Sequence, residues 1–136
     1  MTRFFVDSGY LIALEDEDDQ NHEAALLHWE QEVSSSPPSW ITTSYVLDEV
    51  VTYFNACNLH AKAVEIGQRL MSSPSIQFVH VDESLFQEAW SYFQRHNDKR
   101  YSLTDCVSFV LMTKMGIKSA LTFDKHFTQA GFQKLP

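Results

Sequence analysis

Four acidic residues that lie far apart in the sequence are the side chains best suited to chemistry in this chain. Asp7 ends the segment FFVD, Glu49 lies within TTSYVLDEVV, Asp105 lies within YSLTDC and Asp124 ends ALTFD. Carboxylates bind hard divalent cations and also act as general acids or bases. Each could instead stabilise the first turn of a helix, and Asp105 fits this alternative best because Ser102 precedes it with capping-box spacing. The choice depends on whether the fold brings the four together.

Short apolar segments alternate with longer segments of helical periodicity along the chain. Strands are predicted at 3–6, 40–43, 76–81 and 119–123, and helices at 10–14, 21–33, 45–55, 60–71, 83–96, 103–115 and 125–130. Turns are predicted at 34–39, 72–75, 97–100, Gly116 and Gly131. With 136 residues, 44% of them hydrophobic, the chain can bury one core. We therefore predict a single α/β domain over residues 1–136 with a parallel sheet.

The predicted topology places the four acids at one edge of that sheet. In a parallel sheet with right-handed crossovers, the carboxyl ends of all strands meet at the edge where ligands bind. Asp7 and Asp124 directly follow predicted strands. Asp105 begins a helix that turns back into the strand at 119–123, and Glu49 lies in the second turn of a helix that leaves the strand at 40–43. All four carboxylates are therefore expected to converge.

Glu49 and its neighbour Asp48 occupy different faces of their predicted helix. Glu49 falls beside Val46 and Val50, whereas Asp48 falls among polar residues. This pattern predicts that Glu49 is buried and Asp48 is exposed. A buried carboxylate requires a basic partner or a metal ion.

Clustered carboxylates repel one another and would attract a divalent cation. Two unit charges about 5 Å apart repel by roughly 3 kcal/mol at an effective dielectric constant of about 20. Several such pairs would rival the stability of a whole domain, roughly 5 to 15 kcal/mol. With no His or Cys expected nearby, oxygen ligands favour Mg²⁺ or Mn²⁺ over zinc. Such a site activates water and stabilises the leaving oxygen of a phosphodiester, so we predict phosphodiester hydrolysis.

The acidic composition does not exclude an RNA substrate. The net charge is −8, but it becomes +1 when the five acids of 15–19 and the four candidate ligands are left out. The run at 15–19 is most simply a solvated loop. Candidate phosphate contacts are Lys99, Arg100, Lys125 and His126, with ordinary surface charge as the alternative.

Cysteine use and the amino terminus indicate a cytoplasmic protein. Cys57 and Cys106 lie in apolar helical stretches without paired spacing, which predicts buried free thiols instead of a disulfide or zinc site. No transmembrane segment or leader pattern is expected, because the first residues lead directly into a predicted strand.

Several segments, in order and over essentially the whole chain, resemble PIN-domain ribonucleases, particularly the VapC-type toxins. These segments are VDSGYLIAL, DDQNHEAA, TTSYVLDEVV, YSLTDCVSFVLM and ALTFDKHFTQAGFQKLP. The resemblance implies an α/β/α sandwich with a central, mainly parallel sheet of four to five strands. It also implies a Mg²⁺- or Mn²⁺-dependent endoribonuclease that forms a homodimer and is inhibited by a cognate antitoxin.

The same resemblance assigns roles to individual residues. The four acids match the metal-binding and catalytic quartet of the family, and Ser8 and Thr104 match neighbouring hydroxyl positions that support the carboxylates or the bound water. The chain departs from many relatives at Gly9, where they carry Ser or Asn. The matching positions are Asp7, Ser8, Glu49, Thr104, Asp105 and Asp124.

Other classes of protein fit the sequence less well. An aspartyl phosphatase would carry a second Asp two residues after the first, where this chain has Gly9. A phosphoacceptor receiver domain would carry its acceptor Asp on the central strand and a Lys at the end of the last strand. An RNA-processing nuclease outside a toxin–antitoxin pair and a catalytically silent binding protein of the same fold remain open alternatives.

Overall fold

A five-stranded, fully parallel sheet forms the centre of the protein, with strand order β3-β2-β1-β4-β5. The computed structural model describes residues 3–33 and 39–136. Its elements are β1 (Arg3–Val6), α1 (Ser8–Glu15), α2 (His22–His28), the π-helical turn η1 (Trp29–Val33), β2 (Ser39–Thr43), α3 (Ser44–Ala56), α4 (His60–Ser72), β3 (Ile76–Val79), α5 (Glu83–Arg95), α6 (Leu103–Met115), β4 (Ser119–Leu121), α7 (His126–Gln129) and β5 (Gln133–Leu135).

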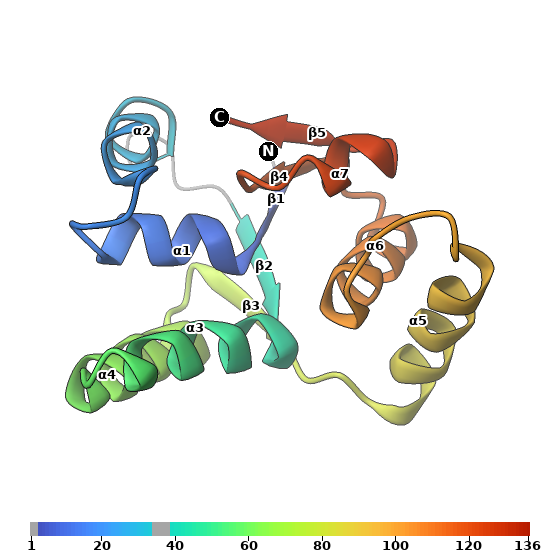
Figure 1. The fold of residues 1–136 in the computed structure, drawn as a ribbon, viewed down its shortest axis with the longest axis horizontal. Helices are drawn as coiled ribbons and strands as arrows, with labels where there is room; N and C mark the ends of the chain where they lie inside the picture. Colours follow the sequence, from blue (N-terminus) through green and yellow to red (C-terminus); the bar gives the residue numbers. More distant parts are fainter. Residues whose placement is uncertain (1–2, 34–38) are drawn as a thin grey trace.

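Helices cover both faces of this sheet. Figure 1 shows α1, α3 and α4 on one side and α5 and α6 on the other. Strands that are covered on both faces are expected to be apolar throughout. In agreement, Phe5, Val6, Ile41, Ala120 and Leu121 are all buried. The predicted α/β/α sandwich is therefore confirmed. Separately, no helix in the described ranges is long and apolar enough to cross a bilayer.

Most predicted elements lie within two residues of their predicted boundaries. The short strand β5 was not predicted from the periodicity, and the helix predicted at 21–33 is α-helical only to His28 and then continues as η1. The strand predicted at 119–123 ends at Leu121, because the chain then turns through hydrogen bonds of Thr122 and Asp124. The turn predicted at 34–39 lies, except for Ser39, outside the described residues.

Local hydrogen bonds fix the helix ends at the carboxyl edge of the sheet. The side chain of Thr43 accepts a hydrogen bond from the backbone of Val46 and so caps α3. Ser102 and Asp105 form the predicted capping box of α6. At the other end of α6, Gly116 has a φ of 69°, which lets the helix stop and the chain turn back into β4. The amino ends of α3 and α6 therefore lie at the edge where β1 and β4 end.

The two cysteines are both free thiols, but they differ in burial. Cys106 is buried in α6, as predicted, whereas Cys57 is exposed. The prediction of burial is wrong for Cys57 because this residue follows the last turn of α3, at its C-cap, beyond the buried part of the helix.

Candidate active site

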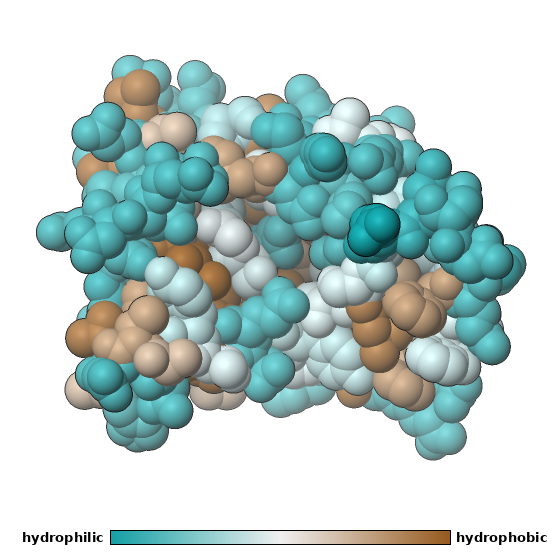
Figure 2. Space-filling view, in the orientation of Figure 1, coloured by the Kyte–Doolittle hydropathy of each residue, from teal (hydrophilic) through white to brown (hydrophobic). Residues whose placement is uncertain are grey.

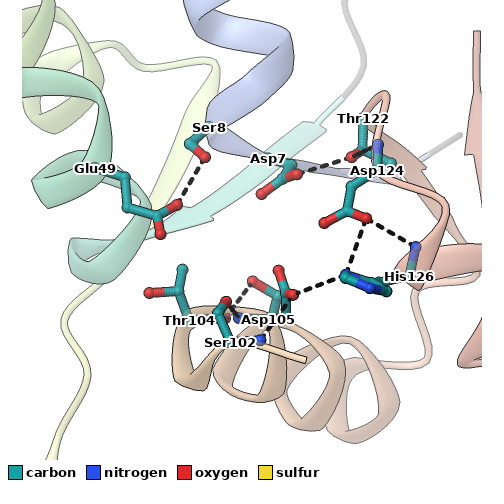
Figure 3. Close-up of polar contacts among 10 residues, drawn as sticks. Asp7, Ser8, Glu49, Ser102, Thr104, Asp105, Thr122, Asp124 and His126 are labelled. Atoms are coloured by element: carbon teal, nitrogen blue, oxygen red, sulfur yellow. Dashed lines mark hydrogen bonds and ion pairs between the residues drawn. The ribbon is translucent and has the colours of Figure 1, made fainter. Parts of the chain in front are cut away.

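Asp7 lies at the end of β1 and points into the protein instead of capping a helix. It occupies the N-cap position of α1, yet its side chain makes no capping hydrogen bond. Its Oδ2 atom instead accepts a hydrogen bond of 2.8 Å from the hydroxyl of Thr122 (Figure 3). Only 6% of Asp7 is exposed. Helix capping therefore does not explain the carboxylate at this position.

Asp105 combines a capping role with a position in the cluster. Its Oδ2 atom accepts from the backbone of Ser102 at 3.1 Å, and its backbone donates to the Ser102 hydroxyl at 2.9 Å. Asp105 is only 8% exposed. The capping box thus fixes the orientation of this carboxylate at the edge of the sheet.

Asp124 follows β4 in a tight turn that fixes its side chain. Its backbone donates to the Thr122 hydroxyl at 3.0 Å, and its Oδ1 atom accepts from the backbone of His126 at 2.9 Å. The second bond is an Asx-turn, in which the side chain closes the turn. The turn holds the Asp124 carboxylate towards Asp105 (Figure 3).

Burial and mutual repulsion disfavour the ionised state of these carboxylates. The pKa of Asp7 is raised to about 7, mainly by burial and to a smaller extent by the charges of Asp105 and Asp124, while the hydrogen bond from Thr122 opposes the increase. Burial also raises the pKa of Asp105, and the charge of Asp124 adds to this effect. No Lys or Arg in the described ranges forms an ion pair with the three carboxylates. A divalent cation would supply the missing positive charge.

His126 also lies in this cluster, where no histidine was predicted. Its Nδ1 atom is 3.1 Å from Asp124 Oδ1 and 3.5 Å from Asp105 Oδ2. One ligand atom from each of the three residues lies within 4.8 Å of the others. The expectation that no histidine lies near the carboxylates is wrong because the Asx-turn brings residue 126 back over Asp124. The two-residue spacing between Asp124 and His126 after a strand was the signal for this contact.

Glu49 is exposed, so the prediction that it is buried is wrong. The buried residues of α3 are Val46, Val50 and Phe54, and Glu49 lies beside this row, facing the open edge of the sheet. Ser8 donates a hydrogen bond of 2.7 Å to Glu49 Oε1. Figure 3 shows this pair on the opposite side of Asp7 from the Asp124–His126 contact. Glu49 thus faces the site from its open side, outside the Asp105–Asp124–His126 cluster.

The remaining predicted residues lie around the cluster. Figure 3 shows Thr104 beside Asp105, on the side towards Glu49. Lys99, Arg100 and Lys125 are exposed. Their solvent-facing positions suit either phosphate contact or ordinary surface charge.

Thr122 is a further member of the site that the sequence analysis did not identify. Its side chain is fully buried, and its single hydroxyl links two acids. The hydroxyl donates to Asp7 Oδ2 and accepts from the backbone of Asp124. The T-x-D spacing at the end of a strand was the available signal, because Ser and Thr hydroxyls often close such turns.

The donor set fits a divalent cation. Three carboxylates meet at the carboxyl edge of a parallel sheet, two of them with raised pKa values. The adjacent His126 Nδ1 atom is buried and has no hydrogen-bond partner in the described structure. Hard divalent cations bind carboxylate oxygens, and imidazole nitrogen can complete such a site for a transition ion. Asp105, Asp124 and His126 form a group that could hold a metal ion, and Asp7 lies beside it, linked to Asp124 through Thr122.

Comparison with known proteins places this arrangement in context. The model of the PIN domain family matches residues 4–133. The 23S rRNA-specific endonuclease VapC20 of Mycobacterium tuberculosis is 35% identical over 128 residues, which are 94% of each chain. The crystal structure of that protein, described as a sarcin-ricin loop cleaving toxin, matches with a TM-score of 0.85 over 95% of both chains. The FitAcB structure from Neisseria gonorrhoeae shares the fold, with a TM-score of 0.66 at 13% identity over 98% of this chain and 96% of that chain.

Proposed function

Because this chain belongs to the PIN domain family, we propose that it is a metal-dependent endoribonuclease and the toxin of a toxin–antitoxin pair. The cluster of Asp105, Asp124 and His126 at the carboxyl edge of the sheet, with the buried Asp7 beside it, is the observation that carries this proposal. Mg²⁺ or Mn²⁺ is the proposed cofactor. The exposed Glu49 and the Ser8 hydroxyl bonded to it complete the proposed site, with Thr104 beside Asp105.

The bound ion would lower the pKa of a water molecule and stabilise the developing charge on the leaving oxygen. Asp7, Asp105 and Asp124 would hold it. Glu49 Oε1 is engaged by Ser8, so we assign Oε2 as the atom that takes the proton from the attacking water. The water oxygen bonds to phosphorus, the bond from phosphorus to the ribose 3′ oxygen breaks, and that oxygen gains a proton from solvent. The products would carry 5′-phosphate and 3′-hydroxyl ends.

Ribosomal RNA is the first substrate to test, because the similar protein VapC20 is described as a 23S rRNA-specific endonuclease. We propose that the exposed Lys99, Arg100 and Lys125 contact its phosphates, since basic side chains position a nucleic acid without reading its sequence. Inhibition by a cognate antitoxin and formation of a homodimer are proposed from the family resemblance. We propose that the protein acts in the cytoplasm, where its proposed RNA substrate lies.

Metal removal tests this function. Purified protein, freed of any antitoxin, is incubated with total cellular RNA and with 23S rRNA in Mg²⁺, in Mn²⁺ or in EDTA. We expect discrete RNA fragments with either metal and none with EDTA, because EDTA removes the divalent cation that the carboxylates are proposed to bind. A folded protein that cleaves none of these RNAs in either metal would favour the alternative of a silent binding protein.

Glu49 and Asp48 form a matched pair of adjacent exposed acids in α3. Glu49→Gln is expected to lower kcat at least about a hundredfold, because removal of a general base typically costs that much. Asp48→Asn should stay within about twofold of wild type, because Asp48 lies on the helix surface, where it accepts a hydrogen bond from Thr52. Single-turnover cleavage measures both variants. Equal losses would contradict the role assigned to Glu49.

Thr122→Val is expected to slow cleavage by about ten- to a hundredfold, the usual effect of losing a residue that orients a metal ligand. The valine keeps the shape of the side chain but removes the bonds to Asp7 and to the Asp124 backbone. The pKa of Asp7 should also rise, since the Thr122 bond lowers it. The pH–rate profile tests this positioning role, with the exposed Thr128→Val as control. An unchanged rate and profile would contradict it.

A further inference from the structure

The Nδ1 atom of His126 lies beside the clustered carboxylates without making a hydrogen bond in the described structure. This atom is buried and lies near Asp124 Oδ1 and Asp105 Oδ2. The ring is held edge-on against Tyr101, with 5.5 Å between centroids, and only 23% of the His126 side chain is exposed. The nitrogen is therefore fixed in the site.

Nδ1 lies within ion-pair distance of both carboxylates, yet it makes no hydrogen bond to either of them within the described structure. If Nδ1 carries a proton, the charged ring contacts the two carboxylates, but its buried N–H group lacks a hydrogen bond. If Nδ1 carries none, its lone pair faces two acidic oxygens and is repelled by them. A cation between the three residues removes the repulsion, because nitrogen and oxygen then donate to the same ion.

The separations match neighbouring ligands of one ion. Two ligands about 2.1 Å from an octahedral ion and at right angles to each other lie about 3.0 Å apart. The Nδ1 atom is 3.1 Å from Asp124 Oδ1 and 3.5 Å from Asp105 Oδ2. Only small movements would bring all three atoms onto one ion, since all lie within 4.8 Å of one another.

We propose that His126 Nδ1 is a ligand of the ion held by Asp105 and Asp124, and that the site therefore prefers a first-row transition ion to Mg²⁺. This inference rests on the proposed metal-dependent function. Mg²⁺ favours oxygen ligands, whereas imidazole suits transition ions. One nitrogen among several carboxylates should shift the preference towards Mn²⁺ without preventing Mg²⁺ from binding.

Pulsed EPR of the Mn²⁺-loaded protein without RNA tests the ligand directly. We expect nuclear modulation from a coordinated nitrogen, and its frequency should change when histidine is labelled with heavy nitrogen. His126→Gln should abolish the modulation, whereas the exposed His80→Gln should keep it. In titrations, His126→Gln should weaken Mn²⁺ binding at least about tenfold and change Mg²⁺ binding less. The labelled wild-type spectrum needs no variant and so does not depend on the folding of His126→Gln.

Two outcomes would overturn the inference in different ways. Mn²⁺ binding with a spectrum free of nitrogen, or modulation that persists in folded His126→Gln, would contradict the His126 ligand alone. Failure of the wild-type protein to bind either Mn²⁺ or Mg²⁺ would contradict the proposed metal-dependent function, and the inference with it.

Discussion

Asp7→Asn is expected to reduce RNA cleavage by at least about a thousandfold and to leave the protein folded. Asn can still accept the hydrogen bond from Thr122, so the local structure is retained while the charge is lost. A metal ion supplies several kcal/mol of transition-state stabilisation, and each 1.36 kcal/mol corresponds to a tenfold change in rate. Initial cleavage rates in saturating Mn²⁺, with circular dichroism to verify folding, measure the effect.

Asp18→Asn is the matched control for this loss. Asp18 is exposed in the acidic loop and outside the site, and the substitution changes the charge by the same amount. We expect its cleavage rate to remain near that of wild type. Folded Asp7→Asn with more than about a hundredth of wild-type activity would contradict the proposed role of Asp7 in holding the metal ion.

Asp7→Asn is also expected to stabilise the metal-free protein at alkaline pH. The pKa of Asp7 is raised from 3.8 to about 7 by burial and by the neighbouring acids. Between these two values the folded protein retains a proton that the unfolded chain has released. The free energy of unfolding therefore falls as the pH rises through this window. At about 1.4 kcal/mol per pKa unit, the free energy of unfolding of the wild-type protein falls by an amount on the order of 4 kcal/mol across this window.

Urea denaturation in EDTA at pH 5 and at pH 8 measures this second effect. Asp7→Asn should be more stable than wild type at pH 8, with a smaller difference at pH 5, because Asn cannot ionise. Addition of Mn²⁺ at pH 8 should stabilise wild type more than the variant, because an ion that binds only the folded state adds to its stability. If Asp7→Asn is less stable than wild type at pH 8 in EDTA, then the ionised Asp7 carboxylate does not destabilise the folded protein, and the prediction is contradicted.

The convergence of three acids could be predicted because it depends on topology. In a parallel sheet the ends of β1 and β4 meet at one edge, and Gly116 reverses the chain so that Asp105 reaches the same edge. Asp7 and Asp124 follow from the position of the strands alone. These features depend on apolar periodicity, which is directly visible in the sequence.

The exposure of Glu49 and the position of His126 could not be predicted in the same way. A helical wheel assigns Glu49 to a face of α3, but it does not show that this face extends past the sheet into an open site. The position of His126 depends on the Asx-turn at Asp124, and the link between Asp7 and Asp124 depends on the buried hydroxyl of Thr122. Such contacts follow from tertiary packing, which periodicity does not describe.

End-group analysis of the cleaved RNA tests the central claim most directly, namely that these carboxylates support metal-activated attack by water. Attack by water is expected to leave 5′-phosphate and 3′-hydroxyl ends, formed with Mg²⁺ or Mn²⁺ and absent in EDTA or with Asp7→Asn. Attack by the ribose 2′-hydroxyl, which requires no metal, would instead leave 2′,3′-cyclic phosphate ends. Cyclic ends that form equally well in EDTA would contradict the metal-dependent mechanism and identify a different kind of ribonuclease.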